Sequence, residues 1–436
     1  MNFLLARACS ACVVLLALCG LAYAGAGTNS ASPSAESRSE LTLALAIETA
    51  LRRNPDLQAS SYEIAAAQAR RTQAGLRPNP DLSVDFENFA GGGEFGGADR
   101  LETTLSLSQV IELGGKRSLR QAVGDADVDL AGIEQRAREL DVLAEVTRHF
   151  VEVVAAQQQL DLARESVELT RKTLEAISVR VEAARSPVAE RSRAQIALTR
   201  ARLDEQRAQG ELRSSRYALA AILGDEDPTF VAAKADLFAL DTLAPFNRLA
   251  AQIERSPDFL RFASDARLRD AELRLAQAQA RPNLALSLGV RRFEETDDAA
   301  LVAGFSMPLP VADRNQGNIR QARIRITQSQ AQRQAAFARA RATLHGLYQQ
   351  LLTSQAQTEA LRSEAVPQAR TALEQVQYGY ERGRFSFVEL ADAQRELLGL
   401  QEAAITSATD YHRLRAEIER LTSAPLAGTA PEASQP

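Results

Sequence analysis

Two kinds of hydrophobic periodicity alternate along this chain. In the first half, apolar or small residues recur every seven positions, and a second set lies three positions after each. These positions are Val146, Val153, Leu160, Val167, Leu174 and Val181, with His149, Ala156, Ala163, Thr170 and Ile177. The second half repeats the pattern at Leu390, Leu397, Ala404, Tyr411 and Ile418. A sustained seven-residue repeat with many small side chains predicts long, closely packed coiled-coil helices.

The helix-breaking residues set the predicted helix lengths. One helix runs from Lys116 to near Ala184, roughly 100 Å at 1.5 Å per residue. Pro187 ends it, and a shorter helix returns to about Leu223. With a further helix over 57–76, the two short helices should lie end to end beside the long one. The second half repeats this order over 258–280, 316–382 and 385–421, and Pro367 should kink its long helix.

Between the short and long helix of each half, apolar and polar residues alternate with a period of two. This pattern predicts four strands, at about 81–89, 101–110, 284–293 and 299–307. A strand of about 9 residues with one apolar and one polar face is what an outer-membrane barrel requires. Half-buried hairpins on a soluble core are the alternative.

The two halves are copies of one another. Arg77-Pro78-Asn79 returns as Arg281-Pro282-Asn283, and Asn54-Pro55-Asp56 returns as Ser256-Pro257-Asp258. We therefore expect a first repeat over 41–223, a linking segment over 224–256, a second repeat over 257–422 and a disordered tail over 423–436. Each repeat contributes one hairpin, so one chain supplies four strands. An open sheet edge is not tolerated in lipid, and the smallest barrels have eight strands. At least two chains would have to share a barrel, and periodicity leaves two and three copies open.

The N-terminal residues resemble a secretory signal. Residues 1–24 contain Arg7, an apolar core and a small-x-small cleavage site that ends at Ala24. An uncleaved anchor helix is the alternative. Lipidation at Cys19 is disfavoured because Leu18 is large for the preceding position. Residues 25–40 are rich in Ala, Ser and Gly and predict a flexible segment.

Composition excludes several functions. The formal net charge of −5 is not the positive charge that a nucleic-acid-binding protein needs. All three cysteines lie in the signal, and Met307 is the only methionine after it. The histidines, His149, His345 and His412, are too far apart for ligand spacing. We see no nucleophile arrangement and no phosphate loop. We therefore expect no enzyme activity, no cofactor and no metal site.

The order of motifs resembles the TolC-like outer membrane efflux family. The opening Leu41-Thr42-Leu43 and both Arg-Pro-Asn turns resemble that family, and the turn at 111–117 resembles its CzcC-like heavy-metal subgroup. The turn residues concerned are Pro78, Asn79, Gly114, Gly115, Pro282 and Asn283. The resemblance implies a mainly α fold in which a homotrimer forms one twelve-stranded outer-membrane barrel on a periplasmic helical barrel. It also implies a passive exit duct that docks to a periplasmic adaptor, or membrane fusion protein, and an inner-membrane RND pump. The expected cargo is divalent metal cations.

The turns at the ends of the long hairpins carry the most informative polar residues. Glu389 and Asp392 are three apart and share one helix face, as many solvated acidic pairs do. The resemblance implies that they ring a narrow periplasmic entrance, with Glu190, Tyr380 and Arg384 holding it shut. It also implies that the tips dock the adaptor, at Arg185, Ser186, Pro187, Gly383, Phe385 and Ser386. Ala184 departs from the family's usual glycine, and Phe385 departs from its usual arginine.

Other functions fit parts of the pattern. An outer membrane duct for drugs or organic solutes, or for type I secretion, would share the same architecture. A periplasmic coiled-coil adaptor without a pore would share the helical hairpins but not the duplicated strands.

Overall fold

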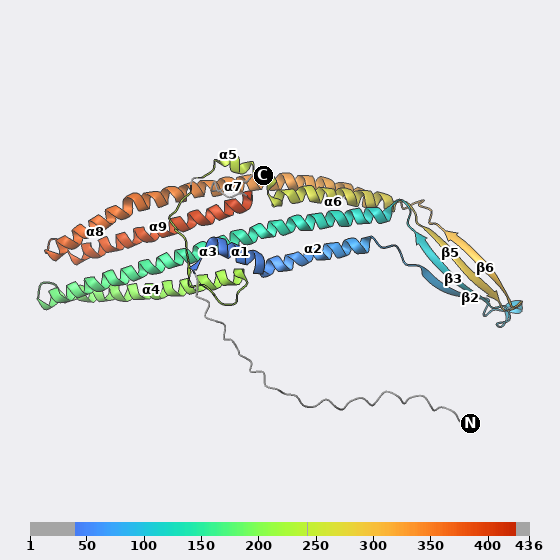
Figure 1. Ribbon diagram of the computed structural model, residues 1–436, viewed down its shortest axis with the longest axis horizontal. Helices are drawn as coiled ribbons and strands as arrows, with labels where there is room; N and C mark the ends of the chain where they lie inside the picture. The colour runs from blue at the N-terminus through green and yellow to red at the C-terminus, as the bar shows by residue number, and fades with distance from the viewer. Residues whose placement is uncertain (1–39, 242, 424–436) are drawn as a thin grey trace, which may run out of the picture. The chain divides into compact units, whose positions relative to one another are not determined.

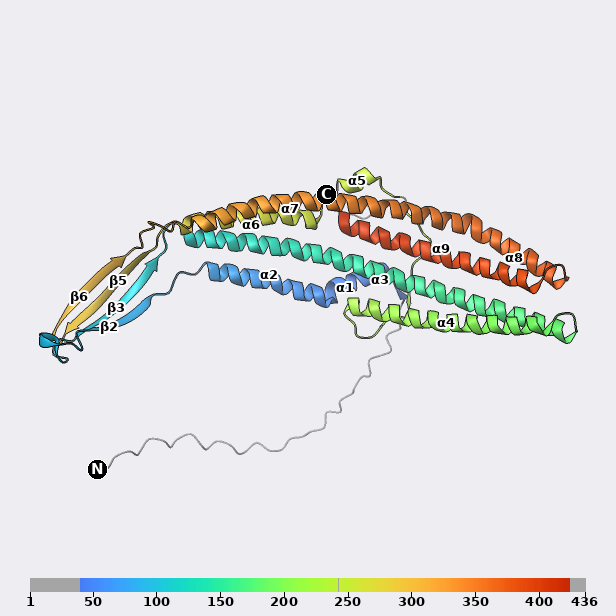
Figure 2. The same cartoon turned by 180° about the vertical axis from the view of Figure 1, so that it is seen from behind.

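The first half of the chain is built around one long helix. The computed structural model describes residues 40–241 and 243–423, and Figures 1 and 2 show its elements from two sides. Helix α3 (Lys116–Glu182) runs for 67 residues without interruption. Helices α2 (Pro55–Ala74) and α4 (Val188–Leu223) pack against successive parts of α3, and the short α1 (Leu43–Arg53) precedes α2. The predicted end-to-end packing is confirmed.

The second half repeats this order with one difference. Helix α6 (Pro257–Gln279) and helix α9 (Phe387–Thr422) pack against α7 (Gln316–Ala360), and α9 also packs against α8 (Val366–Glu381). A π-helical turn at Leu361–Ala365 separates α7 from α8. Pro367 is the second residue after this turn. The proline has no N–H and its ring crowds the carbonyl four residues back, so the wider turn absorbs the irregularity.

The period-two segments form one antiparallel sheet. Its strands are β2 (Asp81–Glu87), β3 (Glu102–Ile111), β5 (Leu284–Phe293) and β6 (Asp298–Ser306), in the order β2-β3-β5-β6. A short turn, η1 (Gly93–Phe95), lies in the first hairpin loop. Each half contributes one hairpin, and β3 pairs with β5. The outer edges of β2 and β6 have no partner among the described residues.

The strand register separates apolar from polar side chains. Val84, Leu105, Val290 and Leu301 occupy one row across all four strands. Ser83, Ser106, Gly289 and Val302 occupy the neighbouring row on the opposite face. Leu301 and Phe305 are 81% and 78% exposed, so the apolar face is uncovered in the single chain.

The helical seams form the core. The five seam residues of α9 are all buried, from Leu390 to Ile418. In α3, Val146, Val153, Leu160 and Ile177 are buried, while Val167, Leu174 and Val181 are half-buried. No helix among the described residues combines the length and the apolar character needed to cross a bilayer.

The segment between the repeats packs along the helices. Strand β1 (Glu40–Leu41) pairs in parallel with β4 (Ala232–Ala233), and the Gln157 side chain bonds both backbone groups of Ala233. Helix α5 (Phe246–Ala250) and the turn η2 (Ile253–Arg255) pack against α7. The predicted signal segment with Cys19, residues 25–39 and the tail from 424 lie outside the described residues.

Candidate gate and junction sites

The two hairpin tips share one backbone turn. At the end of α3, Arg185 N donates to Arg180 O at 2.8 Å and Ala184 N to Val181 O at 3.0 Å. At the end of α8, Arg384 N donates to Gly379 O at 2.8 Å and Gly383 N to Tyr380 O at 3.0 Å. This pair of bonds is the Schellman arrangement, which needs a left-handed residue after the helix. Gly383 supplies it at φ +72°, but in the first half Ala184 supplies it at φ +56°.

The next helix starts differently in the two halves. Ser386 caps α9, because its Oγ accepts from Glu389 N while Glu389 Oε2 accepts from Ser386 N at 2.7 Å. These bonds lower the pKa of the Glu389 carboxyl. The equivalent cap of α4 is Pro187, which has no N–H and no capping side chain. Glu190, three residues later, therefore cannot complete the reciprocal cap that Glu389 makes.

Glu190 instead lies against the other hairpin. The Tyr380 hydroxyl donates to Glu190 Oε2 at 3.5 Å, and Tyr380 is only 4% exposed. Burial, followed by the Glu190 charge, raises the pKa of the Tyr380 hydroxyl. The structure thus brings together two residues that the sequence pointed to, one from each half.

A third residue in this contact, Arg180, had no signal in the sequence. Its Nη1 donates to Tyr380 O at 2.9 Å and to Glu381 O at 3.3 Å. Its guanidinium carbon lies 4.8 Å from the Tyr380 ring centroid, and Nε donates to Ser186 Oγ at 3.3 Å. A cation at the carbonyl end of α8 is favoured by the helix dipole. Arg180 therefore joins the two hairpins.

The other tip residues face solvent. Asp392 is exposed and pairs with Arg395 at 2.9 Å on its own helix, and Glu389 is exposed beside Ser386. The Arg384 side chain is exposed and makes no hydrogen bond or ion pair with the described residues, so it does not join Glu190 and Tyr380. The Phe385 ring covers Gly379, where a Cβ would come within 2.2 Å of it. The other residues expected to dock an adaptor lie in the two turns, and only Ser186 among them is half-buried: Arg185, Ser186, Pro187, Gly383 and Ser386.

A second constellation lies where the helices meet the sheet. Lys116 Nζ donates to Arg281 O at 2.6 Å and to Asn283 Oδ1 at 2.5 Å. The glycine turn of the first half is thereby hydrogen-bonded to the Arg-Pro-Asn turn of the second. Burial lowers the pKa of the Lys116 ammonium, and the nearby Glu112 opposes that shift.

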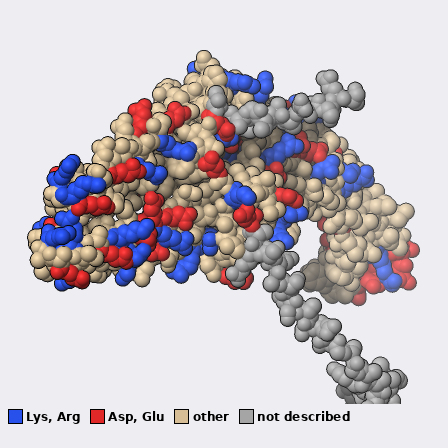
Figure 3. Space-filling model, turned by 60° about the vertical axis from the view of Figure 1, so that its left-hand side comes forward, with Lys and Arg blue, Asp and Glu red and all other residues tan. Residues whose placement is uncertain are grey.

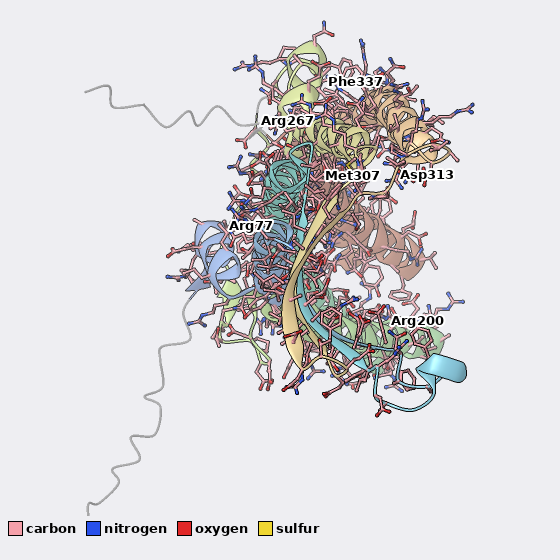
Figure 4. The ribbon with its side chains drawn as sticks, turned by 90° about the vertical axis from the view of Figure 1, so that its right-hand side faces the viewer. Arg77, Arg200, Arg267, Met307, Asp313 and Phe337 are labelled. Carbon is pink, nitrogen blue, oxygen red and sulfur yellow. The ribbon has the colours of Figure 1, made fainter. Side chains whose placement is uncertain are left out.

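The remaining turn residues fit the same junction. Gly114 has φ +77° and lies so close to Arg281 that a Cβ would come within 2.6 Å of its side chain. Gly115, at φ +69°, precedes α3. Pro78 O accepts from Gln109 Nε2 at 3.0 Å, while Asn79 is exposed and Pro282 half-buried. Figure 4, which faces the sheet end, labels Arg77 in the segment that joins α2 to β2, and Met307 and Asp313 in the segment that joins β6 to α7.

The three histidines make separate contacts. The His149 Nδ1 lies 2.8 Å from Glu152 Oε2, His345 packs edge-on to Phe246, and His412 Nε2 bonds Leu237 O at 2.9 Å. No group of three or more His, Cys, Asp or Glu within residues 40–241 and 243–423 is arranged to hold a metal ion.

Comparisons with known proteins agree with this architecture. The family model described as outer membrane efflux protein matches residues 46–225 and 249–424, one match in each half, which confirms the internal repeat. The cobalt-zinc-cadmium resistance protein CzcC of Cupriavidus metallidurans is 30% identical over 83% of this chain and 85% of its own. The solved structure of CusC has a TM-score of 0.74 at 18% identity, covering 87% of this chain and 91% of that one. The outer membrane protein VceC of Vibrio cholerae has a TM-score of 0.68 at 19% identity, covering 88% and 96%. The mainly helical TolC-like fold is thus confirmed, and the chain belongs to the outer membrane efflux protein family.

Proposed function

We propose that three copies of this chain close one twelve-stranded barrel and form the outer membrane exit duct of a tripartite efflux system. The observation that carries the proposal is the four-stranded sheet. It has one uncovered apolar face, and the outer edges of β2 and β6 are unpaired among the described residues. Unpaired backbone groups in hydrocarbon cost several kcal/mol each, so other copies must complete the sheet. Family membership favours this duct over an adaptor without a pore.

The proposed cargo is divalent metal cations. The relative CzcC is named for cobalt, zinc and cadmium resistance. The duct conducts passively, while an inner-membrane RND pump supplies energy and a periplasmic adaptor joins the two. Cargo choice belongs to those partners. The signal is removed near Ala24, without a lipid on Cys19.

The proposed entrance lies at the hairpin tips. Tyr380, Glu190 and Arg180 hold the two hairpins of one chain together and so keep the entrance narrow. Glu389 and Asp392 from three copies add six carboxylates around the axis and favour cations there. Replacing Glu389 and Asp392 together by alanine should lower cation selectivity in planar bilayers. Unchanged conductance and selectivity would remove this role from the pair.

Cross-linking tests the barrel, because the chain after Ala24 contains no cysteine. Ser83→Cys on β2 is combined in turn with Ala300→Cys, Val302→Cys or Gly304→Cys on β6, all on the polar face. Oxidation should give a ladder that ends at three chains for at least one pair. Ser83→Cys with Leu301→Cys, on opposite faces, is the control and should not cross-link. A ladder that ends at two, or no ladder with any pair, contradicts the trimer.

Cargo is tested in a metal-sensitive strain that carries an RND pump and a periplasmic adaptor. Adding the chain should raise tolerance to cobalt, zinc and cadmium. Raised tolerance to drugs or organic solutes alone would favour the alternative duct, and secretion of a protein substrate would favour type I export.

A further inference from the structure

One arginine on the polar face of the sheet is held by three side chains. Arg291 of β5 donates from Nη1 to Glu102 Oε2 at 2.8 Å and from Nε to Thr104 Oγ1 at 2.9 Å. Its Nη2 lies 2.8 Å from Glu87 Oε2 on β2. The Arg291 and Glu102 side chains are 30% and 23% exposed, and that of Glu87 is 51% exposed. The cluster spans three strands and lies at the end of the sheet away from the helices.

Among the described residues of the four strands, this cluster is the only place where carboxylates of the polar face contact a cation on the same face. The register places five strand carboxylates there: Asp81, Asp85, Glu87, Glu102 and Asp298. Among the described strand residues, Arg291 is the sole basic residue on that face. Figure 3 shows acidic side chains gathered at the sheet end of the molecule.

Glu87 and Glu102 are directly opposite each other in the ladder between β2 and β3. Like charges in this position repel, so the pair needs a cation between them. Two carboxylates on facing strands also offer the oxygen ligands that divalent cations accept. In the absence of Arg291, a passing divalent ion would fill the same place.

We propose that Arg291 is a tethered counter-ion that stops exported divalent cations from binding between Glu87 and Glu102. The inference rests on the proposed duct, in which the polar face lines the lumen. Conduction requires that ions bind weakly enough to leave. Arg291 therefore stops Glu87 and Glu102 from retaining cations, while Asp81, Asp85 and Asp298 on the same face still attract them.

Cadmium binding to the purified detergent-solubilised trimer tests this. Arg291→Gln keeps a polar side chain beside Thr104 but removes the charge. Equilibrium dialysis against cadmium chloride should show about one additional ion per chain, with a Kd of roughly 0.1–1 mM, as for other sparse carboxylate sites. The additional binding should disappear when Glu87→Gln and Glu102→Gln are added. Cadmium should also reduce the conductance of Arg291→Gln channels, but not that of the unmodified channel.

Two controls separate this effect from a general loss of charge. Arg292→Gln removes a neighbouring arginine whose side chain lies on the opposite face with Asp297. Arg291→Lys keeps a cation in the cluster. Both should bind no more cadmium than the unmodified chain.

The outcomes distinguish the inference from the function on which it rests. Equal cadmium binding by Arg291→Gln, Arg292→Gln and unmodified trimers would overturn the inference and leave the duct intact. Failure of the unmodified chain to form trimers or channels would overturn the duct itself.

Discussion

The Arg180 guanidinium donates to the Tyr380 carbonyl oxygen at 2.9 Å, although the two residues are 200 positions apart in the chain. This bond ties α3 to the end of α8 and has the strength of a charge-assisted contact. We expect Arg180→Ala to weaken the docking of the two hairpins by about 1.5–3 kcal/mol. The measurement is the rate of proteolysis in the 183–187 and 382–386 turns.

The control for this prediction is Arg185→Ala. Arg185 lies in the adjacent turn and is exposed, so its loss should change proteolysis little. Equal protection in Arg180→Ala and the unmodified chain would show that the contact contributes nothing to docking.

The alanine in the first tip is a point of backbone strain. Ala184 holds φ +56°, where a Cβ is disfavoured by roughly 1–2 kcal/mol. Ala184→Gly should raise the free energy of unfolding by about 1 kcal/mol, and the matched Gly383→Ala should lower it by a similar amount. Thermal unfolding followed by circular dichroism measures both. Shifts in the same direction for the two variants would contradict the strain argument.

The residue that caps the helix determines what the glutamate three positions later can bind. Pro187→Ser would supply α4 with a hydroxyl and an N–H, as Ser386 does for α9. Glu190 could then complete its own cap, and Tyr380 would lose its partner. We expect a more stable start of α4, by about 1 kcal/mol, but a more conductive entrance. Bilayer recordings test this, and Ala189→Ser, which leaves the cap unchanged, is the control.

Lys116 is the contact that joins the two strand–helix turns. Lys116→Met keeps the length of the side chain but leaves Arg281 O and Asn283 Oδ1 without their donor. The free energy of unfolding should fall by about 2–4 kcal/mol, since both acceptors bond a charged group. Lys172→Met, on the exposed surface of α3, is the matched control and should cost little. Trimers as heat-stable as the unmodified protein would show that the junction does not depend on this lysine.

His412 predicts a dependence of stability on pH. Burial lowers the pKa of its imidazole, and among the nearby charges Arg415 adds to this shift while Asp241 and Asp236 oppose it. Below about pH 6.5 the unfolded chain therefore binds more protons than the folded one, and the free energy of unfolding falls as the pH drops through that range. His412→Gln should reduce the difference in unfolding temperature between pH 7.5 and 5.5. An equal difference in His412→Gln and in the unmodified chain would contradict this prediction.

Hydrophobic periodicity is sufficient to predict the helices and strands but not the contacts between them. The heptad seam of α9 and the alternation in β5 report which side chains are buried or share a face, and both are local properties of the sequence. The contact of Arg180 is not predictable from the sequence, because its hydrogen-bond acceptors on α8 are backbone carbonyl oxygens, which any residue could supply. The sequence identifies Lys116 only as part of a turn, since its acceptor, Asn283, belongs to the other repeat. The π-helical turn also begins before Pro367, at residues that carry no helix-breaking signal.

The π-helical turn is a structural difference between the two repeats that their similar sequences do not indicate. Helix α3 is continuous, whereas its counterpart is jointed between Ala360 and Val366. In a ring of three copies, continuous α3 helices and interrupted α7–α8 helices would alternate around the circumference. A force applied at the hairpin tips would then bend the helices unequally. The ring would deform first at the three evenly spaced π-helical turns, while the three continuous copies of α3 would maintain its diameter.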